Sequence, residues 1–176
     1  MKCMTETDQT VERGAQLSDC GMYRYRLWRE WDASRPTLAF LMLNPSTADN
    51  LDEDPTLTRC LARAIANDLG RLEVVNLFPL RAPSPEELLS DPDALGPRNL
   101  ANCSILEAVD RASMVICAWG SHDAAAMRIS YVVHLLCITS MAGKLFHLGL
   151  NPDGNPTHPP YAPASRRPKQ FMWSPS

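Results

Sequence analysis

Four segments of the chain are continuously apolar, which is the pattern of strands buried on both faces of a sheet. They span residues 37–43, 72–76, 114–118 and 144–148. Longer stretches with apolar residues at helical spacing lie between them, so strands and helices alternate along the chain. This alternation predicts a mostly parallel α/β sheet, because right-handed crossovers place helices on both of its faces.

The segment YRYRLWREW at 23–31 differs, because its aromatic and apolar residues alternate with arginines. A period of two predicts a half-buried antiparallel strand. Residues 1–20 are polar and aperiodic, and we expect a disordered or frayed tail there. The predicted fold is one three-layer α/β/α domain over residues 21–176, with a mostly parallel central sheet of about four strands plus one N-terminal antiparallel strand.

The clearest helix signal follows the first covered strand. Asp54 is placed to cap this helix, Pro55 suits its first position, and Gly70 is placed to end it. Its arginines, Arg59 and Arg63, are expected to face solvent. Its predicted core face recurs every four residues and consists of Leu57, Leu61, Ile65 and Leu69.

Composition and charge narrow the possible functions. A net charge of −3 disfavours tight binding that rests on nucleic-acid phosphates, although a local basic patch can coexist with it. The six cysteines contain no CxxC pair, so we expect buried free thiols in a reducing compartment and no metal or other cofactor. The sequence has neither a signal-peptide core nor a membrane span, which predicts a cytoplasmic location and no membrane partner.

Polar residues gather directly after each covered strand. The carboxyl ends of parallel strands meet at one edge of a sheet, where ligands bind. We therefore expect one polar cleft at this edge. Its candidate residues are Asn44, Pro45, Ser46, Thr47, Asp49, Asn76, Arg81, Trp119, Gly120, His122, Asp123 and His158.

Several candidates also have a purely structural interpretation. Ser46 and Thr47 can satisfy backbone groups in a turn, and Trp119 can be a core residue. Asn76 is harder to explain structurally, because an amide at the end of a covered strand needs partners and can recognise a base edge. His158 lies among prolines, which hold its direction. The acidic residues of the first loop can face water or hold a divalent cation, and they are Asp49, Asp52 and Asp54.

Six segments together resemble the bacterial and phage family catalogued as domain of unknown function 1643. They are YRYRLWREW, MLNPSTAD, DPTLTRC, VVNLFPLRAPSPEEL, AWGSH and HPPY. The resemblance runs from about Tyr23 to Trp173. It implies no established activity.

Four of these motifs are also similar, in the same order, to motifs of the uracil-DNA glycosylase superfamily. That resemblance implies that Asn44 orients the attacking water, that Asn76 recognises the base, and that His158 stabilises charge on the departing base. The chain departs from the superfamily in three features: it has no aspartate-tyrosine pair in the first motif, no leucine after HP, and no paired cysteines for an iron-sulfur centre.

The expected function is a nucleobase- or nucleotide-binding cleft that hydrolyses an N-glycosidic bond. Two alternatives stay open: a non-catalytic module that binds a nucleotide or modified base, and a metal-dependent nucleotide-processing enzyme. The expected partner is a small nucleotide or base-containing ligand, with weak binding to nucleic acid. The residues that would hold flanking phosphates are Arg81, Arg166, Arg167 and Lys169.

Overall fold

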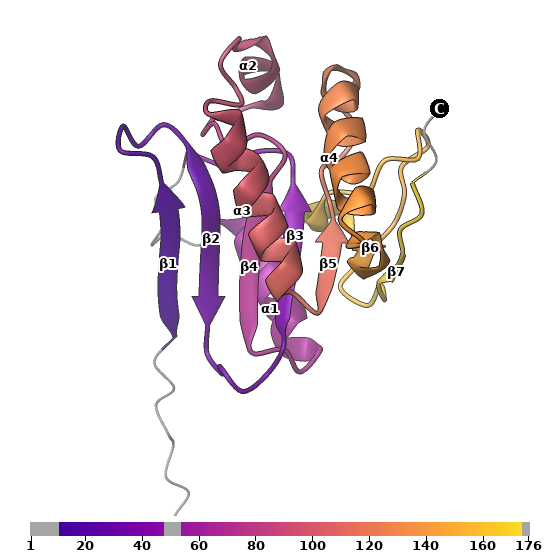
Figure 1. Ribbon diagram of the computed structural model, residues 1–176. Helices are drawn as coiled ribbons and strands as arrows, with labels where there is room; N and C mark the ends of the chain where they lie inside the picture. The colour runs from indigo at the N-terminus through magenta and orange to yellow at the C-terminus, as the bar shows by residue number, and fades with distance from the viewer. Residues whose placement is uncertain (1–10, 48–53, 174–176) are drawn as a thin grey trace, which may run out of the picture.

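A mixed sheet forms the centre of the molecule in the computed structural model, which describes residues 11–47 and 54–173 (Figure 1). Within these residues the sheet has seven strands in the order β1-β2-β4-β3-β5-β6-β7. Their bounds are β1 Glu12–Leu17, β2 Arg24–Glu30, β3 Thr37–Met42, β4 Arg71–Asn76, β5 Met114–Cys117, β6 Leu145–His147 and β7 Lys169–Gln170.

The four strands at the centre of the sheet are parallel. β3 pairs in parallel with β4 and β5, and β5 pairs in parallel with β6. These are the four covered strands predicted from sequence, and the α/β class is confirmed. The predicted N-terminal antiparallel strand is also present, as β2 beside β4. The predicted extent of the sheet is wrong, because β1 adds a further antiparallel strand beyond β2 and β7 adds one at the other side.

β1 overturns part of the predicted tail. Residues 12–17 have no apolar alternation, yet they pair with β2 along their whole length. Gly14 contributes to this pairing, because a Cβ atom at its position would overlap the indole of Trp28. Pairing with the edge of β2 therefore makes a strand of a segment whose own pattern predicts none. Residues 1–10, the first half of the predicted tail, lie outside the described part of the chain.

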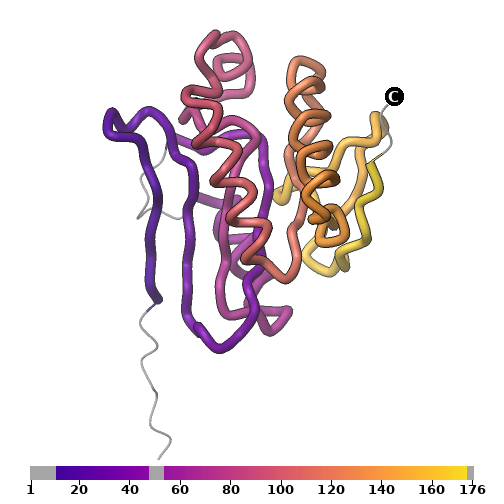
Figure 2. The backbone as a smooth tube through the Cα atoms, viewed as in Figure 1, coloured from indigo at the N-terminus to yellow at the C-terminus, as the bar shows by residue number. Residues whose placement is uncertain are grey.

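Helices cover both faces of the sheet (Figures 1 and 2). Helices α3 (Arg98–Arg111) and α4 (Ala126–Ile138) lie on one face, and α1 (Pro55–Ala66) lies on the other. A short helix, α2 (Pro85–Ser90), lies in the proline-rich segment between β4 and α3. Three 3-10 turns complete the described elements: η1 Asp123–Ala125, η2 Ala142–Lys144 and η3 Pro159–Tyr161. None of the described helices combines the length and apolar character needed to cross a membrane.

Helix α1 begins as predicted, and Leu57, Leu61 and Leu69 of its predicted core face pack on the core, but Ile65 does not. Asp54 caps it, since its Oδ1 accepts a hydrogen bond from the backbone N–H of Leu57 at 2.7 Å. The helix ends at Ala66, before Gly70, and Ile65 is 54% exposed. Its buried positions are Leu57, Cys60 and Ala64, because the smaller side chains allow the helix to pack closely on the sheet.

Arg63 is not the solvent-facing residue that its position predicts. Its guanidinium donates to the backbone carbonyls of Arg166, at 2.6 Å, and Pro163, at 3.0 Å. Half-buried against the C-terminal segment, it fastens α1 to the residues that follow η3.

The cysteines differ in burial. All five described cysteines are free, as expected, but only Cys60 and Cys117 are buried. The expectation of uniformly buried thiols is therefore wrong for the other three, Cys20, Cys103 and Cys137.

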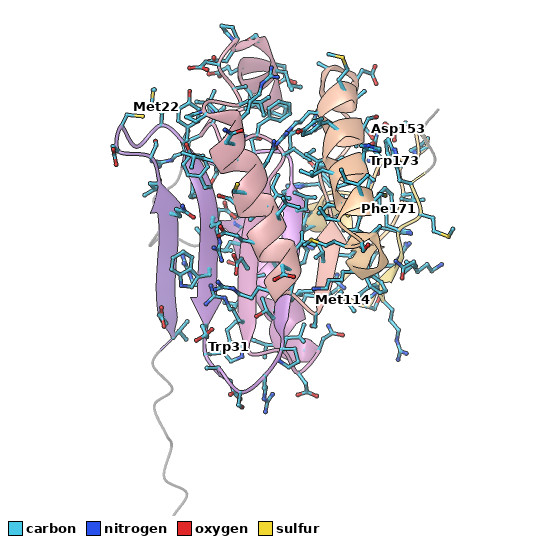
Figure 3. All side chains as sticks on the ribbon, viewed as in Figure 1. Met22, Trp31, Met114, Asp153, Phe171 and Trp173 are labelled. Atoms are coloured by element: carbon cyan, nitrogen blue, oxygen red, sulfur yellow. The ribbon has the colours of Figure 1, made fainter. Side chains whose placement is uncertain are left out.

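The topology creates a crevice at the carboxyl ends of β3 and β5. The chain leaves β3 toward α1 on one face of the sheet and leaves β5 toward α4 on the other, so the two loops diverge. Such a switch point is where open α/β sheets bind ligands. In Figure 3 this edge is the upper end, near the labelled Met22 and Asp153, whereas Trp31 and Met114 mark the opposite end.

Candidate functional site

A cavity of about 460 Å³ lies at the switch point. This volume is in the range of small-molecule sites. It is walled by the loops that follow β3, β4 and β5, by the start of β2, and by η3. The polar and aromatic residues that line it include Arg24, Asn44, Ser46, Asp54, Asn76, Trp119, His122, Asn151, His158 and Tyr161.

Eight of the predicted site residues line this one cavity. They are Asn44, Pro45, Ser46, Asn76, Trp119, Gly120, His122 and His158. Thr47, Arg81 and Asp123 are not among the lining residues, and Asp49 lies outside the described part of the chain. Arg81 instead fastens the rim, since its guanidinium donates to the backbone carbonyls of Thr47 at 2.6 Å and Gly21 at 3.3 Å.

Asn44 has a fixed orientation in the cavity wall. Its Nδ2 donates to the carbonyl oxygens of Pro45, at 2.9 Å, and Ala82, at 3.1 Å. Because carbonyl oxygens only accept, the amide nitrogen must face them, and both of its hydrogens are used. Oδ1 is the remaining polar atom of this side chain and can only accept a hydrogen bond.

Asn76 has a buried amide oxygen that no described residue satisfies. The residue is 6% exposed, and its Oδ1 has no hydrogen-bond partner among the described residues. A buried polar atom left unpaired costs about 1–3 kcal/mol, so such groups are rare in folded proteins. The position of Asn76 in the cavity wall makes a ligand the natural partner of this amide.

His158 is held in one tautomer by the backbone. Its Nδ1 lies 3.2 Å from the carbonyl oxygen of Ala118, which can only accept, so Nδ1 carries the hydrogen. Burial lowers the pKa of His158 below its ordinary value of 6.5, and the nearby His122 lowers it further, while the Ala118 bond and Asp54 oppose the shift. At neutral pH the ring is therefore uncharged, and its Nε2 offers a lone pair.

The cavity's one described carboxylate is already in use. Asp54 caps α1 through Oδ1, and its Oδ2 accepts a hydrogen bond from Ser46 Oγ at 3.0 Å. Within the described residues no three His, Cys, Asp or Glu side chains converge as metal ligands would. Asp49 and Asp52, the other two acids of the metal alternative, lie outside those residues.

Trp119 and Gly120 contribute to the shape of the cavity wall through packing and backbone conformation. Trp119 is 1% exposed, packs edge-to-face on Phe171, and donates from Nε1 to Asn155 Oδ1 at 3.1 Å, so its core interpretation holds. Gly120 has φ of +78°, a left-handed conformation that favours glycine. This turn brings His122 back to the cavity, where a Cβ on Gly120 would lie 3.3 Å from its Nε2.

Arg24 lines the cavity although its sequence pattern predicts an outward-facing residue. Leu17 of β1 pairs with Arg24, and the adjacent Gln16 pairs with Arg26. Tyr25 is therefore an extra residue in β2, a β-bulge. Arg24 is 7% exposed, and burial, with the nearby Arg81 as the next cause, lowers its pKa to about 10. An alternating pattern carries no signal for a bulge, which is why sequence reasoning missed this residue.

Tyr161 is a second lining residue that the sequence did not single out. It is 79% exposed and stands on η3 at the rim of the cavity. Its ring is tilted against His158, with the two ring centres 6.2 Å apart. The HPPY motif contained the only available signal, since it places this tyrosine three residues after His158.

The basic residues proposed to hold flanking phosphates do not line the cavity. Arg166, Arg167 and Lys169 are exposed on the C-terminal segment, outside the cavity wall. Any contact they make with a ligand lies beyond the pocket that holds Asn44, Asn76 and His158.

Comparisons with known proteins add a family. The sequence model of the family described as "Protein of unknown function (DUF1643)" matches residues 24–160, which confirms the first resemblance. No curated protein matches the chain. Among solved structures, the hetero-hexameric glutamate dehydrogenase from Thermus thermophilus in its leucine-bound form aligns at 14% identity with a TM-score of 0.39. That alignment covers 84% of this chain and 33% of the dehydrogenase chain, and a TM-score this low implies nothing about fold or function.

Proposed function

The chain belongs to the DUF1643 family, whose description names no function, and from the geometry of its cavity we propose that it binds a base-containing ligand and hydrolyses the N-glycosidic bond. One observation carries the proposal. Asn44, Asn76 and His158, separated by up to 114 residues in sequence, line a single cavity, and Asn76 Oδ1 is buried there with no hydrogen-bond partner among the described residues.

Two polar atoms of the cavity wall can hold a water molecule. Asn44 Oδ1 and His158 Nε2 are both acceptors, because the hydrogens of each side chain are already donated to backbone carbonyls. A water that donates to both keeps a lone pair for attack. Asn76, with an acceptor and two donors on one amide, suits the edge of a nucleobase.

The reaction follows from these positions. The water oxygen bonds to C1′ of the sugar while the C1′–N bond breaks, and the base nitrogen keeps the electron pair. His158 Nε2 takes the proton released by the water, and the departing base recovers a proton from His158 or solvent. His158 is thus a general base, a role that commonly contributes 10²–10⁴-fold in rate.

This role differs from the one that the glycosylase resemblance implies. A histidine that stabilises a departing base anion must donate a hydrogen bond from Nε2. The uncharged ring of His158 carries its hydrogen on Nδ1, because Ala118 O can only accept. The tautomer therefore supports proton uptake from water.

Binding and hydrolysis can be tested separately. We expect nucleosides or nucleotides to raise the melting temperature, and we expect chromatography to detect free base and free sugar after incubation. In Asn76→Leu, binding should be lost. In His158→Gln, binding should persist while base release falls by at least 10²-fold. Binding without base release in the wild type would establish a non-catalytic binding module, and no binding to any base-containing compound would refute the proposal.

A further inference from the structure

The cavity has an aromatic side chain at its rim whose ring is open to solvent. Tyr161 lines the cavity from η3, yet the residue is 79% exposed. A tyrosine has a large apolar ring and a polar hydroxyl, so it suits contacts at the boundary between a protein and water. The proposed reaction gives this ring no role.

The other rings of the cavity wall are less open to a ligand. Trp119 is 1% exposed and packs edge-to-face on Phe171, with the ring centres 5.6 Å apart, so a ligand cannot lie flat against it. The two histidines of the wall, His122 and His158, are half-buried. Among the described lining residues, Tyr161 therefore presents the largest open ring face.

The backbone of Tyr161 is fixed although its side chain is exposed. Pro159 and Pro160 precede it and restrict the chain, and the Tyr161 N–H donates to His158 O at 3.0 Å. The next residue, Ala162, is 3% exposed and packs in the core on the α1 side of the sheet. Because a tyrosine side chain has only two torsions, holding its ring against a ligand costs little conformational entropy.

The ring of Tyr161 is a neighbour of the proposed general base. Its centre lies 6.2 Å from the centre of the His158 ring, and the two planes are tilted by 55°. A ligand whose sugar is placed for attack by a water at His158 therefore lies close to the Tyr161 ring.

We infer that the ring of Tyr161 stacks on the face of the bound base, and that the preferred ligands are purine nucleosides and nucleotides. Asn76 can bind only the edge of a planar base and leaves its faces unrecognised. Stacking on an aromatic side chain binds the face, and two fused rings overlap a tyrosine ring more than a single ring does. The inference rests on the proposed function and narrows its substrate class.

The test compares four nucleosides: adenosine, guanosine, cytidine and uridine. Calorimetry would measure their binding to the wild type, Tyr161→Leu and Tyr161→Phe. Tyr131→Leu is the matched control, because Tyr131 is also exposed, at 52%, but lies on α4 outside the cavity wall. The melting temperature of each unliganded variant shows whether it folds, and the loss of an exposed ring should change it little.

We expect the two purine nucleosides to bind the wild type several-fold more tightly than the two pyrimidine nucleosides. Tyr161→Leu should weaken purine binding by about tenfold or more, since stacking on one aromatic side chain commonly contributes that much, and should remove the purine preference. Tyr161→Phe keeps the ring and should bind like the wild type, as should Tyr131→Leu.

Other results would overturn the inference and leave the proposed function standing. Equal binding of purine and pyrimidine nucleosides by the wild type would refute purine selection, and unchanged affinity in Tyr161→Leu would refute the stacking contact. An equal loss of affinity in Tyr161→Leu and Tyr161→Phe would assign the effect to the hydroxyl and refute stacking as well. If none of the four nucleosides binds the wild type, the proposed function fails together with the inference.

Discussion

Asn76 has a buried amide that costs stability in the unliganded protein. Replacing it with leucine, which has a similar shape, removes the unpaired Oδ1 and adds apolar contacts at a site that is 6% exposed. We expect Asn76→Leu to raise the free energy of unfolding by about 1 kcal/mol while abolishing ligand binding. Urea denaturation measures the change.

Asn155→Leu is a matched control for this prediction. Asn155 Oδ1 accepts from Trp119 Nε1, so its loss leaves a buried donor unpaired and should lower the free energy of unfolding by about 1–3 kcal/mol. If both variants are destabilised equally, the amide of Asn76 is satisfied inside the protein and is not reserved for a ligand.

The proton state of His158 determines the expected pH dependence. Its pKa lies below 6.5, and the proposed reaction needs the uncharged ring. Above its pKa the His158 ring is uncharged. The rate of base release should therefore stay level near neutral pH and fall only as the pH drops through the lowered pKa of His158. A rate that rises as the pH falls below 6.5 would instead require the protonated ring.

Titration by NMR checks the same point without a substrate. The midpoint for His158 should lie below 6.5, and it should rise in His122→Gln because His122 is one cause of the lowered pKa. An unshifted midpoint would contradict the burial of this ring in the cavity.

At the scale of elements, one residue serves both the cavity and a helix: Asp54 lines the cavity and caps α1. Asp54→Ala removes the N-cap and should lower the free energy of unfolding by about 1 kcal/mol, whereas Asp54→Asn should change it little, because asparagine caps equally well. Asp54→Asn also removes a charge that raises the pKa of His158, so that pKa should fall further. Urea denaturation and the His158 titration measure the two effects.

Ser46→Ala separates the two contributions of Asp54 to stability, the cap of α1 and the hydrogen bond with Ser46. It removes the other hydrogen bond to the Asp54 carboxylate, at 3.0 Å, and leaves the bond to Leu57 N–H in place. A loss of stability in Ser46→Ala as large as in Asp54→Ala would show that the hydrogen bond with Ser46, and not the cap, makes the larger contribution.

The elements also show what a sequence pattern can predict. The start of α1 was predictable because capping depends on neighbouring residues, Asp54 and Pro55. Its buried face was only partly predictable, because Cys60 and Ala64 are buried by the fit of α1 to the sheet, a tertiary effect that a leucine repeat does not contain. The bulge at Tyr25 depends on pairing with β1, a strand that itself has no pattern of its own.

At the scale of the molecule, the parallel centre was predictable and the antiparallel edges were not. Strands buried on both faces are continuously apolar, whereas β1 and β7 are edge strands without that pattern, and their pairing partners decide their structure. Topology also explains the predicted site: Asn44 follows β3, Asn76 ends the neighbouring β4, and His158 lies in the loop after β6, and all three line one cavity at the carboxyl edge of the sheet. Arg24 escaped prediction because it enters from the antiparallel side.

The charge of the whole molecule predicts weak binding to duplex DNA. The chain has a net charge of −3, and the basic residues Arg166, Arg167 and Lys169 lie outside the cavity wall. Each phosphate neutralised adds about 0.9 to the slope of log affinity against log salt. We expect weak binding to random duplex at about 150 mM salt, with a slope shallower than about −4.

A triple variant distinguishes DNA binding at the surface from ligand binding in the cavity. It combines Arg166→Gln, Arg167→Gln and Lys169→Gln. It should remove the residual duplex binding and leave mononucleotide binding unchanged, because none of the three side chains lines the cavity. Fluorescence anisotropy with labelled duplex over a salt series measures the first effect, and calorimetry measures the second. Tight duplex binding with a slope steeper than about −4 would mean that at least four or five phosphates are neutralised, and DNA would then replace the mononucleotide as the preferred ligand.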